Sequence, residues 1–133
     1  FDGEHYTFPE GFLTLPKPYK DDIPFLVGGH SKYAFKRAAT LGNGWLPQQS
    51  ALSIEPSELI EPINLMKNEV LSLGKDPDKF KIILRINQSA NSADIIAENL
   101  NSLSEVGVNE IIVDIDWSEN AAMQRTADVL LNL

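Results

Sequence analysis

The sequence of 133 residues contains no cysteine, which excludes disulfides, thiolate metal sites and cysteine nucleophiles. Basic residues are scarce: 11 Lys and Arg stand against 19 Asp and Glu, giving a formal net charge of −8. This balance argues against a nucleic-acid partner, because binding a phosphate backbone needs clustered cations. No apolar run reaches the length of a membrane span, and no signal-peptide pattern opens the chain. We therefore expect a cytoplasmic protein without a membrane partner.

What the sequence does contain is typical of one globular domain. Hydrophobic residues make up 43 % and charged residues 23 % of the chain, and both are ordinary values. The length suffices for one core but not for two. The chain starts at Phe1 rather than at a methionine, so we expect a piece of a longer protein.

Residues 1–23 differ in character from the rest. Pro9, Pro16 and Pro18 interrupt a segment with little periodicity. Proline removes a backbone donor and favours extended geometry in the residue before it. We expect an extended arm over residues 1–23 and one folded unit over residues 24–133.

Within the folded unit, short apolar runs alternate four times with segments whose apolar residues recur at helical spacing. The runs predict buried strands and the segments predict helices. Ser31 and Gly42 are expected to cap the first helix, and Gly74 to end the second. The expected strands are residues 24–27, 44–47, 80–86 and 110–115; the expected helices span 31–41, parts of 56–73, 92 to about 107, and 118 almost to 133.

Continuous apolar strands that alternate with helices indicate an α/β fold of parallel βαβ units. Four such units are half of a closed eight-stranded barrel. A doubly wound open sheet of the flavodoxin type shows the same alternation. The number of strands does not separate the two architectures.

Five short motifs, in this order, resemble those of the luciferase-like monooxygenases. FDGEHY at residues 1–6 is similar to the family's F-x-G-x-x-Y element, and PKP at 16–18 to the approach to its next strand. PFLVGG at 24–29 resembles the strand P-P-I-L-I-G-G. KRAA and GNGW within 36–45 resemble R-A-A-x-x-G-D-G-W, and GKDP at 74–77 resembles the turn G-R-D-P. Asn43 stands where the family usually has Asp, which suits the turn but removes a carboxylate.

This resemblance implies the C-terminal half of a luciferase-like (β/α)8 TIM barrel with parallel strands. It also implies an oxidoreductase that uses reduced FMN or a reduced deazaflavin (coenzyme F-420) on a small organic substrate, the cofactor supplying the redox chemistry. A barrel cut in two leaves unpaired strand edges. We therefore expect the fragment to be inactive alone, and to form a homo-oligomer or to bind the missing N-terminal half.

The residues that follow the expected strands are the candidates for a site, because α/β barrels carry their sites there. The loop after the first strand joins glycines to a helix N-terminus, where backbone amides can hold a phosphate. The alternative is a tight turn that needs glycine for its backbone alone. Taken with the family resemblance, the expected cofactor-binding residues are Gly28, Gly29, His30, Ser31, Arg37 and Gln48.

Other polar residues have more than one interpretation. His30 is the one candidate for a catalytic base, although a lone loop histidine is more often a surface or hydrogen-bonding residue. Asp114 and Asp116 lack a nearby third ligand, so we expect no metal site, and helix capping explains Asp116 better. Arg85 lies within an apolar strand and needs either a ligand anion or an internal acid as its partner. Trp45 is expected to pack beneath the site.

Two further functions stay open. One is a non-catalytic half-barrel scaffold or binding module that associates with itself. The other is a flavodoxin-like nucleotide binder that holds phosphate at the glycine turn of residues 28–29.

Overall fold

The computed structural model describes residues 1–11, 15–19 and 23–131. Over these residues the chain forms the expected α/β fold, with parallel strands and four α-helices. The strands are β1 (Leu26–Gly28), β2 (Gly44–Leu46), β3 (Gln48–Ser50), β4 (Lys81–Asn87) and β5 (Glu110–Val113). The helices are α1 (Lys32–Leu41), α2 (Ser57–Ser72), α3 (Ala93–Glu105) and α4 (Asn120–Leu131), with a 3₁₀ turn at Pro77–Lys79.

β2 and β3 are two pieces of one strand. Both pair with β4 in the same register, Gly44 opposite Lys81 and Gln48 opposite Arg85. Pro47 separates them because proline has no N–H for the ladder. Its carbonyl still accepts a hydrogen bond of 2.9 Å from the Arg85 N–H. The second expected strand therefore continues past Pro47.

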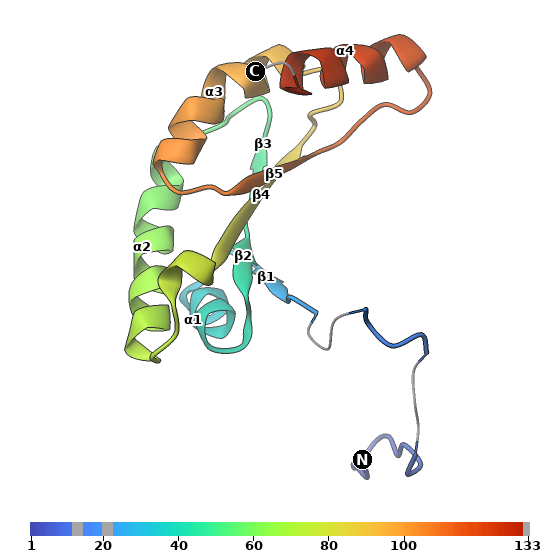
Figure 1. Ribbon diagram of the computed structural model, residues 1–133, viewed down its shortest axis with the longest axis vertical. Helices are drawn as coiled ribbons and strands as arrows, with labels where there is room; N and C mark the ends of the chain where they lie inside the picture. Colours follow the sequence, from blue (N-terminus) through green and yellow to red (C-terminus); the bar gives the residue numbers. More distant parts are fainter. Residues whose placement is uncertain (12–14, 20–22, 132–133) are drawn as a thin grey trace.

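The sheet follows the order of the chain. β1 pairs with β2, the β2–β3 strand pairs with β4, and β4 pairs along its other edge with β5. All four helices lie on one side of this sheet: in Figure 1, α2 runs along the left, α3 and α4 lie towards the top, and α1 lies at the lower end. A doubly wound sheet carries helices on both faces. The observed arrangement therefore differs from the flavodoxin-type alternative.

The core lies between the helices and the sheet. Side chains alternate along β4: Ile82, Leu84 and Ile86 are fully buried, whereas Arg85 is exposed on the other face. Each fully buried Ile or Leu contributes about 1.5–3 kcal/mol by leaving water. The helix residues that complete this core are Phe35, Ala38 and Ala39 of α1, Leu59, Ile63, Met66 and Val70 of α2, and Ile96 and Leu103 of α3.

The helix ends that the sequence predicts are confirmed at three positions. The hydroxyl of Ser31 accepts a hydrogen bond of 3.2 Å from the Ala34 N–H and caps α1, which ends at Gly42. Gly74 follows α2 with a φ of 71°, a left-handed conformation that glycine adopts readily. Pro62 lies inside α2 rather than in its first turn, so this helix tolerates one missing backbone donor.

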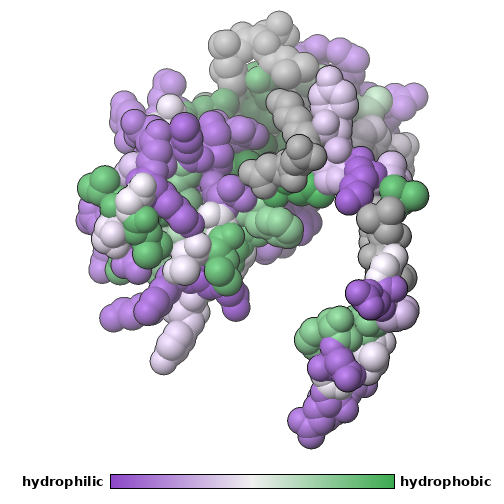
Figure 2. Space-filling view, turned by 60° about the horizontal axis from the view of Figure 1, so that its bottom comes forward, coloured by the Kyte–Doolittle hydropathy of each residue, from purple (hydrophilic) through white to green (hydrophobic). Residues whose placement is uncertain are grey.

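The two ends of the chain differ from the compact body. The last helix begins later than the expected Ser118, because the chain first turns at Asp116; its expected extension to residue 133 lies outside the described residues. In the arm, Thr7 bonds to Asp2, and the rings of Phe1 and Phe8 lie 6.4 Å apart. The described residues of the arm lie away from the sheet (Figure 1) and include a hydrophobic patch (Figure 2).

No helix within the described ranges is long and apolar enough to cross a membrane.

Candidate functional site

The carboxyl ends of the strands bring most of the predicted site residues to one edge of the sheet. Because every strand pair is parallel, these ends point the same way, as they do at the mouth of an α/β barrel. The β1–α1 loop supplies Gly29, His30 and Ser31, and β3 supplies Gln48. We call this edge the carboxyl edge.

The β1–α1 loop has a backbone that only glycine fits well. Gly29 has a φ of 107°, and a Cβ placed on it would lie 3.0 Å from the Cβ of Ala34. Its carbonyl oxygen accepts a hydrogen bond of 2.8 Å from the indole N–H of Trp45. The backbone of this turn therefore requires glycine at position 29 even without a ligand, as the tight-turn interpretation expects. The turn also leaves the N-terminus of α1, whose first turn contains Lys32 and no acidic residue, facing the carboxyl edge.

Trp45 packs beneath this loop, as expected. It is fully buried, and its ring meets Phe35 edge-on at 5.4 Å and His30 edge-on at 5.6 Å between ring centroids. Aromatic pairs prefer this edge-to-face geometry. The indole therefore holds the loop backbone and lies in edge contact with the histidine ring above it.

His30 and Gln48 lie together, although the sequence separates them. The His30 Nε2 accepts a long hydrogen bond of 3.5 Å from the Gln48 N–H, a weak contact by ordinary criteria. His30 is exposed, and no carboxylate in the described part of the chain bonds to its ring. An exposed, loosely held imidazole can turn towards a ligand.

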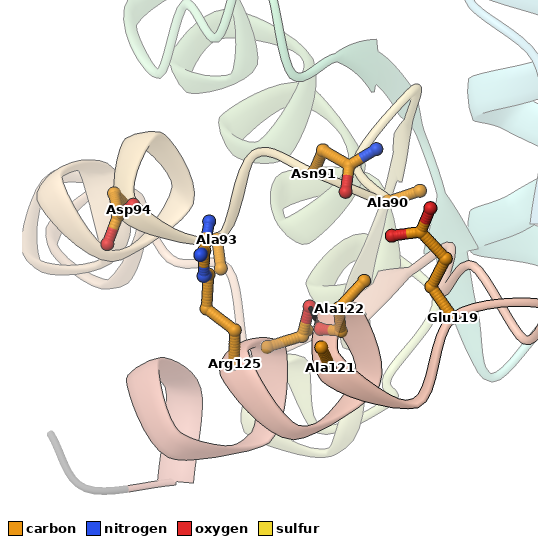
Figure 3. A pocket seen from close by; sticks show the side chains of 9 residues that line it. Ala90, Asn91, Ala93, Asp94, Glu119, Ala121, Ala122 and Arg125 are labelled. Atoms are coloured by element: carbon orange, nitrogen blue, oxygen red, sulfur yellow. Dashed lines mark hydrogen bonds between the residues drawn. The ribbon is translucent and has the colours of Figure 1, made fainter.

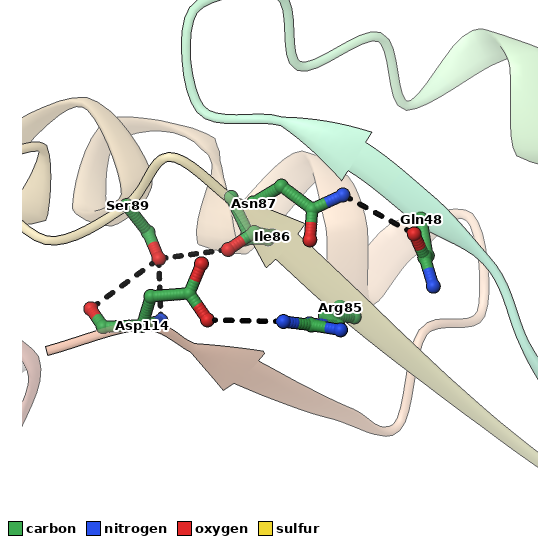
Figure 4. A network of polar contacts seen from close by, with 6 residues as sticks. All are labelled: Gln48, Arg85, Ile86, Asn87, Ser89 and Asp114. Atoms are coloured by element: carbon green, nitrogen blue, oxygen red, sulfur yellow. Dashed lines mark hydrogen bonds and ion pairs between the residues drawn. The ribbon is translucent and has the colours of Figure 1, made fainter.

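Two polar pairs continue the carboxyl edge across the sheet (Figure 4). The side-chain amide of Asn87 donates a hydrogen bond of 3.2 Å to the Gln48 Oε1. A guanidinium nitrogen of Arg85 lies 3.4 Å from a carboxylate oxygen of Asp114. The partner of Arg85 is thus an internal acid. Both members of this pair are nearly half exposed, so the pair is worth only about 0–1 kcal/mol and leaves guanidinium donors free for an anion.

Ser89 ties the ends of β4 and β5 together and was not anticipated from the sequence. It is fully buried; its hydroxyl donates to the Ile86 carbonyl at 2.7 Å and accepts from the Asp114 N–H at 2.6 Å. These two hydrogen bonds hold the end of β5 in place, so that the Asp114 side chain faces Arg85 (Figure 4). A serine just past a strand carries no sequence signal that distinguishes this role from an ordinary turn residue.

Arg37, one of the predicted cofactor-binding residues, lies away from the carboxyl edge, and two other polar side chains are engaged by the protein itself. Arg37 is exposed in the middle of α1, about 7.5 Å along the axis from the helix start at Lys32, and makes no hydrogen bond or ion pair within the described residues. The side-chain amide of Gln49 is engaged by the backbone of Glu55. Asp116 accepts hydrogen bonds from Ser118, first from its hydroxyl and then from its N–H, and both lower the pKa of Asp116.

A separate polar hollow of about 120 Å³ lies between the starts of α3 and α4 (Figure 3). Arg125 reaches from α4 towards α3, with Asp94 and Glu119 among the lining residues. Neither acid forms an ion pair with Arg125 in the described structure. Ligand pockets usually measure about 300–1,000 Å³, so this hollow has room for only a few waters or a very small ion.

Neither a scan against protein-family models nor a search of the curated proteins finds a match to this chain. The family resemblance therefore rests on the order of the short motifs.

Proposed function

We propose that this chain is the cofactor-phosphate side of a luciferase-like (β/α)8 barrel, an oxidoreductase that uses reduced FMN or a reduced deazaflavin on a small organic substrate. The observation that supports the barrel most is the strand order. Parallel strands follow the chain from β1 to β5 with every helix on one side, which is how a barrel wall is built. The luciferase-like motifs then suggest which barrel.

The β1–α1 loop suits the phosphate of such a cofactor. Gly29 lets the backbone come close to a ligand. The first N–H groups of α1 and the positive end of its dipole favour an anion. Ser31 accepts the capping bond with its hydroxyl oxygen and so keeps its own hydrogen for a ligand. Lys32, in the first turn of α1, adds a positive charge beside the positive end of the helix dipole, and both favour a phosphate there.

The rest of the carboxyl edge suits the polar rim of a flavin ring. Side-chain amides both donate and accept, which matches the alternating N–H and carbonyl groups of that rim. Gln48 and Asn87 lie side by side there, and Arg85 offers donors from the neighbouring strand position. When bound, FMN would supply oxygen activation and a deazaflavin would supply hydride transfer. His30 is placed to hold or move a proton beside such a ring.

One wall of a barrel buries only part of a ligand, so the chain alone should bind its cofactor weakly and not turn over substrate. Phosphate recognition is still testable with this chain. We expect FMN to bind at least about tenfold more tightly than riboflavin, because each charge-assisted hydrogen bond to the phosphate is worth about 1.5–3 kcal/mol. Isothermal titration calorimetry with FMN, riboflavin and the deazaflavin measures this difference directly.

Two histidine variants make the binding test specific. His30→Ala should weaken FMN binding, whereas His5→Ala, which changes the arm, should leave it unchanged. Equal affinity for FMN and riboflavin would contradict the phosphate site. The absence of binding by FMN and by the deazaflavin would contradict the proposed function as a whole.

A further inference from the structure

The face of the sheet opposite the helices is uncovered over the described residues (Figure 1). We call it the open face; it carries the side chains that alternate with the buried ones on each strand. Leu26, Leu46 and Ile83 lie on it and are only partly buried, and Ile112 is 44 % exposed. The equivalent residues on the helix side of β4 are fully buried. Apolar side chains that remain exposed to solvent in the middle of strands indicate a surface that another element covers.

The two outer edges of the sheet are complementary in direction. In the described chain nothing pairs with the outer edge of β1 or with that of β5. A two-fold axis along the strands would set the β5 edge of one copy beside the β1 edge of another, with all strands parallel. We call each such contact between the β5 edge of one copy and the β1 edge of the other a joint. The two-fold axis makes the two joints identical, so no strand edge stays free. With β2 and β3 counted as one strand, two copies give the eight strands of a small closed barrel.

At each joint, an aromatic side chain protrudes from the β1 edge and a groove lies beside the β5 edge. Phe25 directly precedes β1, and its carbonyl accepts a hydrogen bond of 2.8 Å from the Asn43 N–H, so the parallel pairing reaches it. Alternation places its side chain on the same side of the sheet as Val27, which packs against the core. Phe25 is nevertheless 66 % exposed. An aromatic ring at a free edge is the kind of anchor that dominates interfaces.

The groove lies beside the opposite edge. Between α3 and β5 is a hollow of about 400 Å³, lined in part by Leu100, Leu103, Val108 and Ile111. Both this groove and Phe25 lie towards the amino-terminal ends of their strands. When β1 of one copy pairs with β5 of the other, Phe25 therefore meets the groove at the same level of the sheet.

The charges of the open face favour a second copy over an unlike partner. The chain carries a net charge of −8, so most of its surface repels another copy. On the open face, Lys81 and Arg85 are balanced by Glu110 and Asp114. Two identical faces with equal numbers of both signs can approach without net repulsion and can pair their charges.

The exposed area is sufficient for such an interface. The chain exposes 9645 Å², whereas a compact monomer of this mass exposes about 7,000 Å². The extended arm, whose described residues are almost all exposed, contributes to this excess. A specific interface of standard size needs only about 800 Å² from each partner.

We propose that a second copy of this chain covers the open face, pairing β1 of each copy with β5 of the other and seating each Phe25 in the groove between α3 and β5 of its partner. The docking itself needs no cofactor. It also completes the carboxyl edge into a ring, so that two half-sites face one mouth; this last consequence alone rests on the proposed function.

Sedimentation equilibrium without cofactor tests the docking. We expect the chain to have twice its monomer mass at micromolar concentrations. Phe25→Asp and Ile112→Asp should each raise the dimer Kd by about a hundredfold or more, because each change acts twice in a symmetric interface. Tyr33→Asp, which alters an aromatic side chain that is 87 % exposed on α1, should leave the Kd unchanged. Circular dichroism checks that each variant is folded.

Cross-linking tests the pairing of edges. Because the chain has no cysteine, Phe25→Cys and Asn101→Cys chains can be mixed, at a concentration above the dimer Kd that loss of the Phe25 ring raises, and treated with a short bis-maleimide. A covalent dimer should form in the mixture and not with Phe25→Cys alone, since the two Phe25 positions lie at opposite joints. A monomer at every concentration overturns the proposal, as does a series of larger open-ended species. A dimer that both Asp variants leave intact overturns it too. Cofactor binding is measured separately by calorimetry. The failure of the docking proposal can therefore be distinguished from the failure of the proposed function.

Discussion

The indole N–H of Trp45 donates a hydrogen bond of 2.8 Å to the carbonyl oxygen of Gly29, across the gap between β2 and the β1–α1 loop. Trp45 is fully buried, and the loop it holds is exposed. The loop that we propose as a phosphate site is thus held from beneath by the core. A preorganised backbone of this kind lowers the entropic cost of ligand binding.

Replacement of this indole should loosen the loop and the core together. Trp45→Phe removes the donor and part of a buried ring, so we expect unfolding in urea to cost about 1–3 kcal/mol less free energy. The second tryptophan is a matched control: Trp117 is 77 % exposed, and Trp117→Phe should change stability by less than about 0.5 kcal/mol. Similar effects of the two substitutions would show that Trp45 does not have the role described.

Gly29→Ala should destabilise the fold more than Gly74→Ala does. Both glycines have positive φ, 107° and 71°, and alanine is strained in either conformation by about 1–3 kcal/mol. Only at Gly29 does the new Cβ also meet another side chain, that of Ala34, at 3.0 Å; at Gly74 it meets nothing within 4 Å. Chemical unfolding of both variants measures the difference. If Gly74→Ala is less stable than Gly29→Ala, the close contact between a Cβ at position 29 and Ala34 does not destabilise the fold as described.

The secondary structure was largely predictable because local signals agree with it. Ser31, Gly42 and Gly74 set helix ends through their own backbone and side-chain preferences, which a sequence displays directly. The extension of the second strand beyond Pro47 was not predictable, because proline usually ends a ladder and its pairing with Arg85 depends on a strand far away in the chain. The order of the strands in the sheet is likewise a property of tertiary contacts.

Ser89 should matter more than its neighbour Ser92. Ser89→Ala leaves the Asp114 N–H without the acceptor it has at 2.6 Å, and an unsatisfied, partly buried donor costs about 1–3 kcal/mol. Ser92 stands at the N-cap of α3 without a capping bond from its side chain, and its hydroxyl donates only a long, exposed hydrogen bond of 3.4 Å to the Gln88 carbonyl, so Ser92→Ala should change stability by less than about 0.5 kcal/mol. Thermal or urea unfolding distinguishes them, and equal effects would argue against the bridge between β4 and β5.

Asp116 should titrate below the usual range of an aspartate. Hydrogen bonds from the Ser118 hydroxyl (2.6 Å) and N–H (2.9 Å) favour its charged form and lower its pKa. A carboxyl whose pKa is lower in the folded state contributes stability above the ordinary aspartate pKa, and loses it as the pH falls through the lowered value. Carboxyl-carbon NMR titration measures this pKa.

Ser118→Ala should raise the pKa of Asp116 only partway, because the N–H of residue 118 remains. A serine change in α3, Ser104→Ala, is the control and should leave the Asp116 titration in place. If Ser118→Ala does not move the pKa of Asp116, the hydrogen bond from the hydroxyl is not its cause.

The candidate site was predictable only where its residues are neighbours in the sequence. The glycine loop stands out because two glycines before a helix are a local signal. The contact of His30 with Gln48, the amide pair of Gln48 with Asn87 and the bridge through Ser89 join different strands. Their residue types are common in turns, so no pattern in the sequence marks them.

The central claim, that the carboxyl edge of this sheet binds a phosphate-bearing flavin, is tested most directly by NMR mapping of the backbone amides during titration with FMN. We predict that the amides of Gly29, His30 and Ser31 shift most, that Gln48 and Asn87 shift less, and that riboflavin moves the second group without the first. Shifts confined to the hollow beside Arg125 between α3 and α4, or no shifts at any concentration, would contradict the claim.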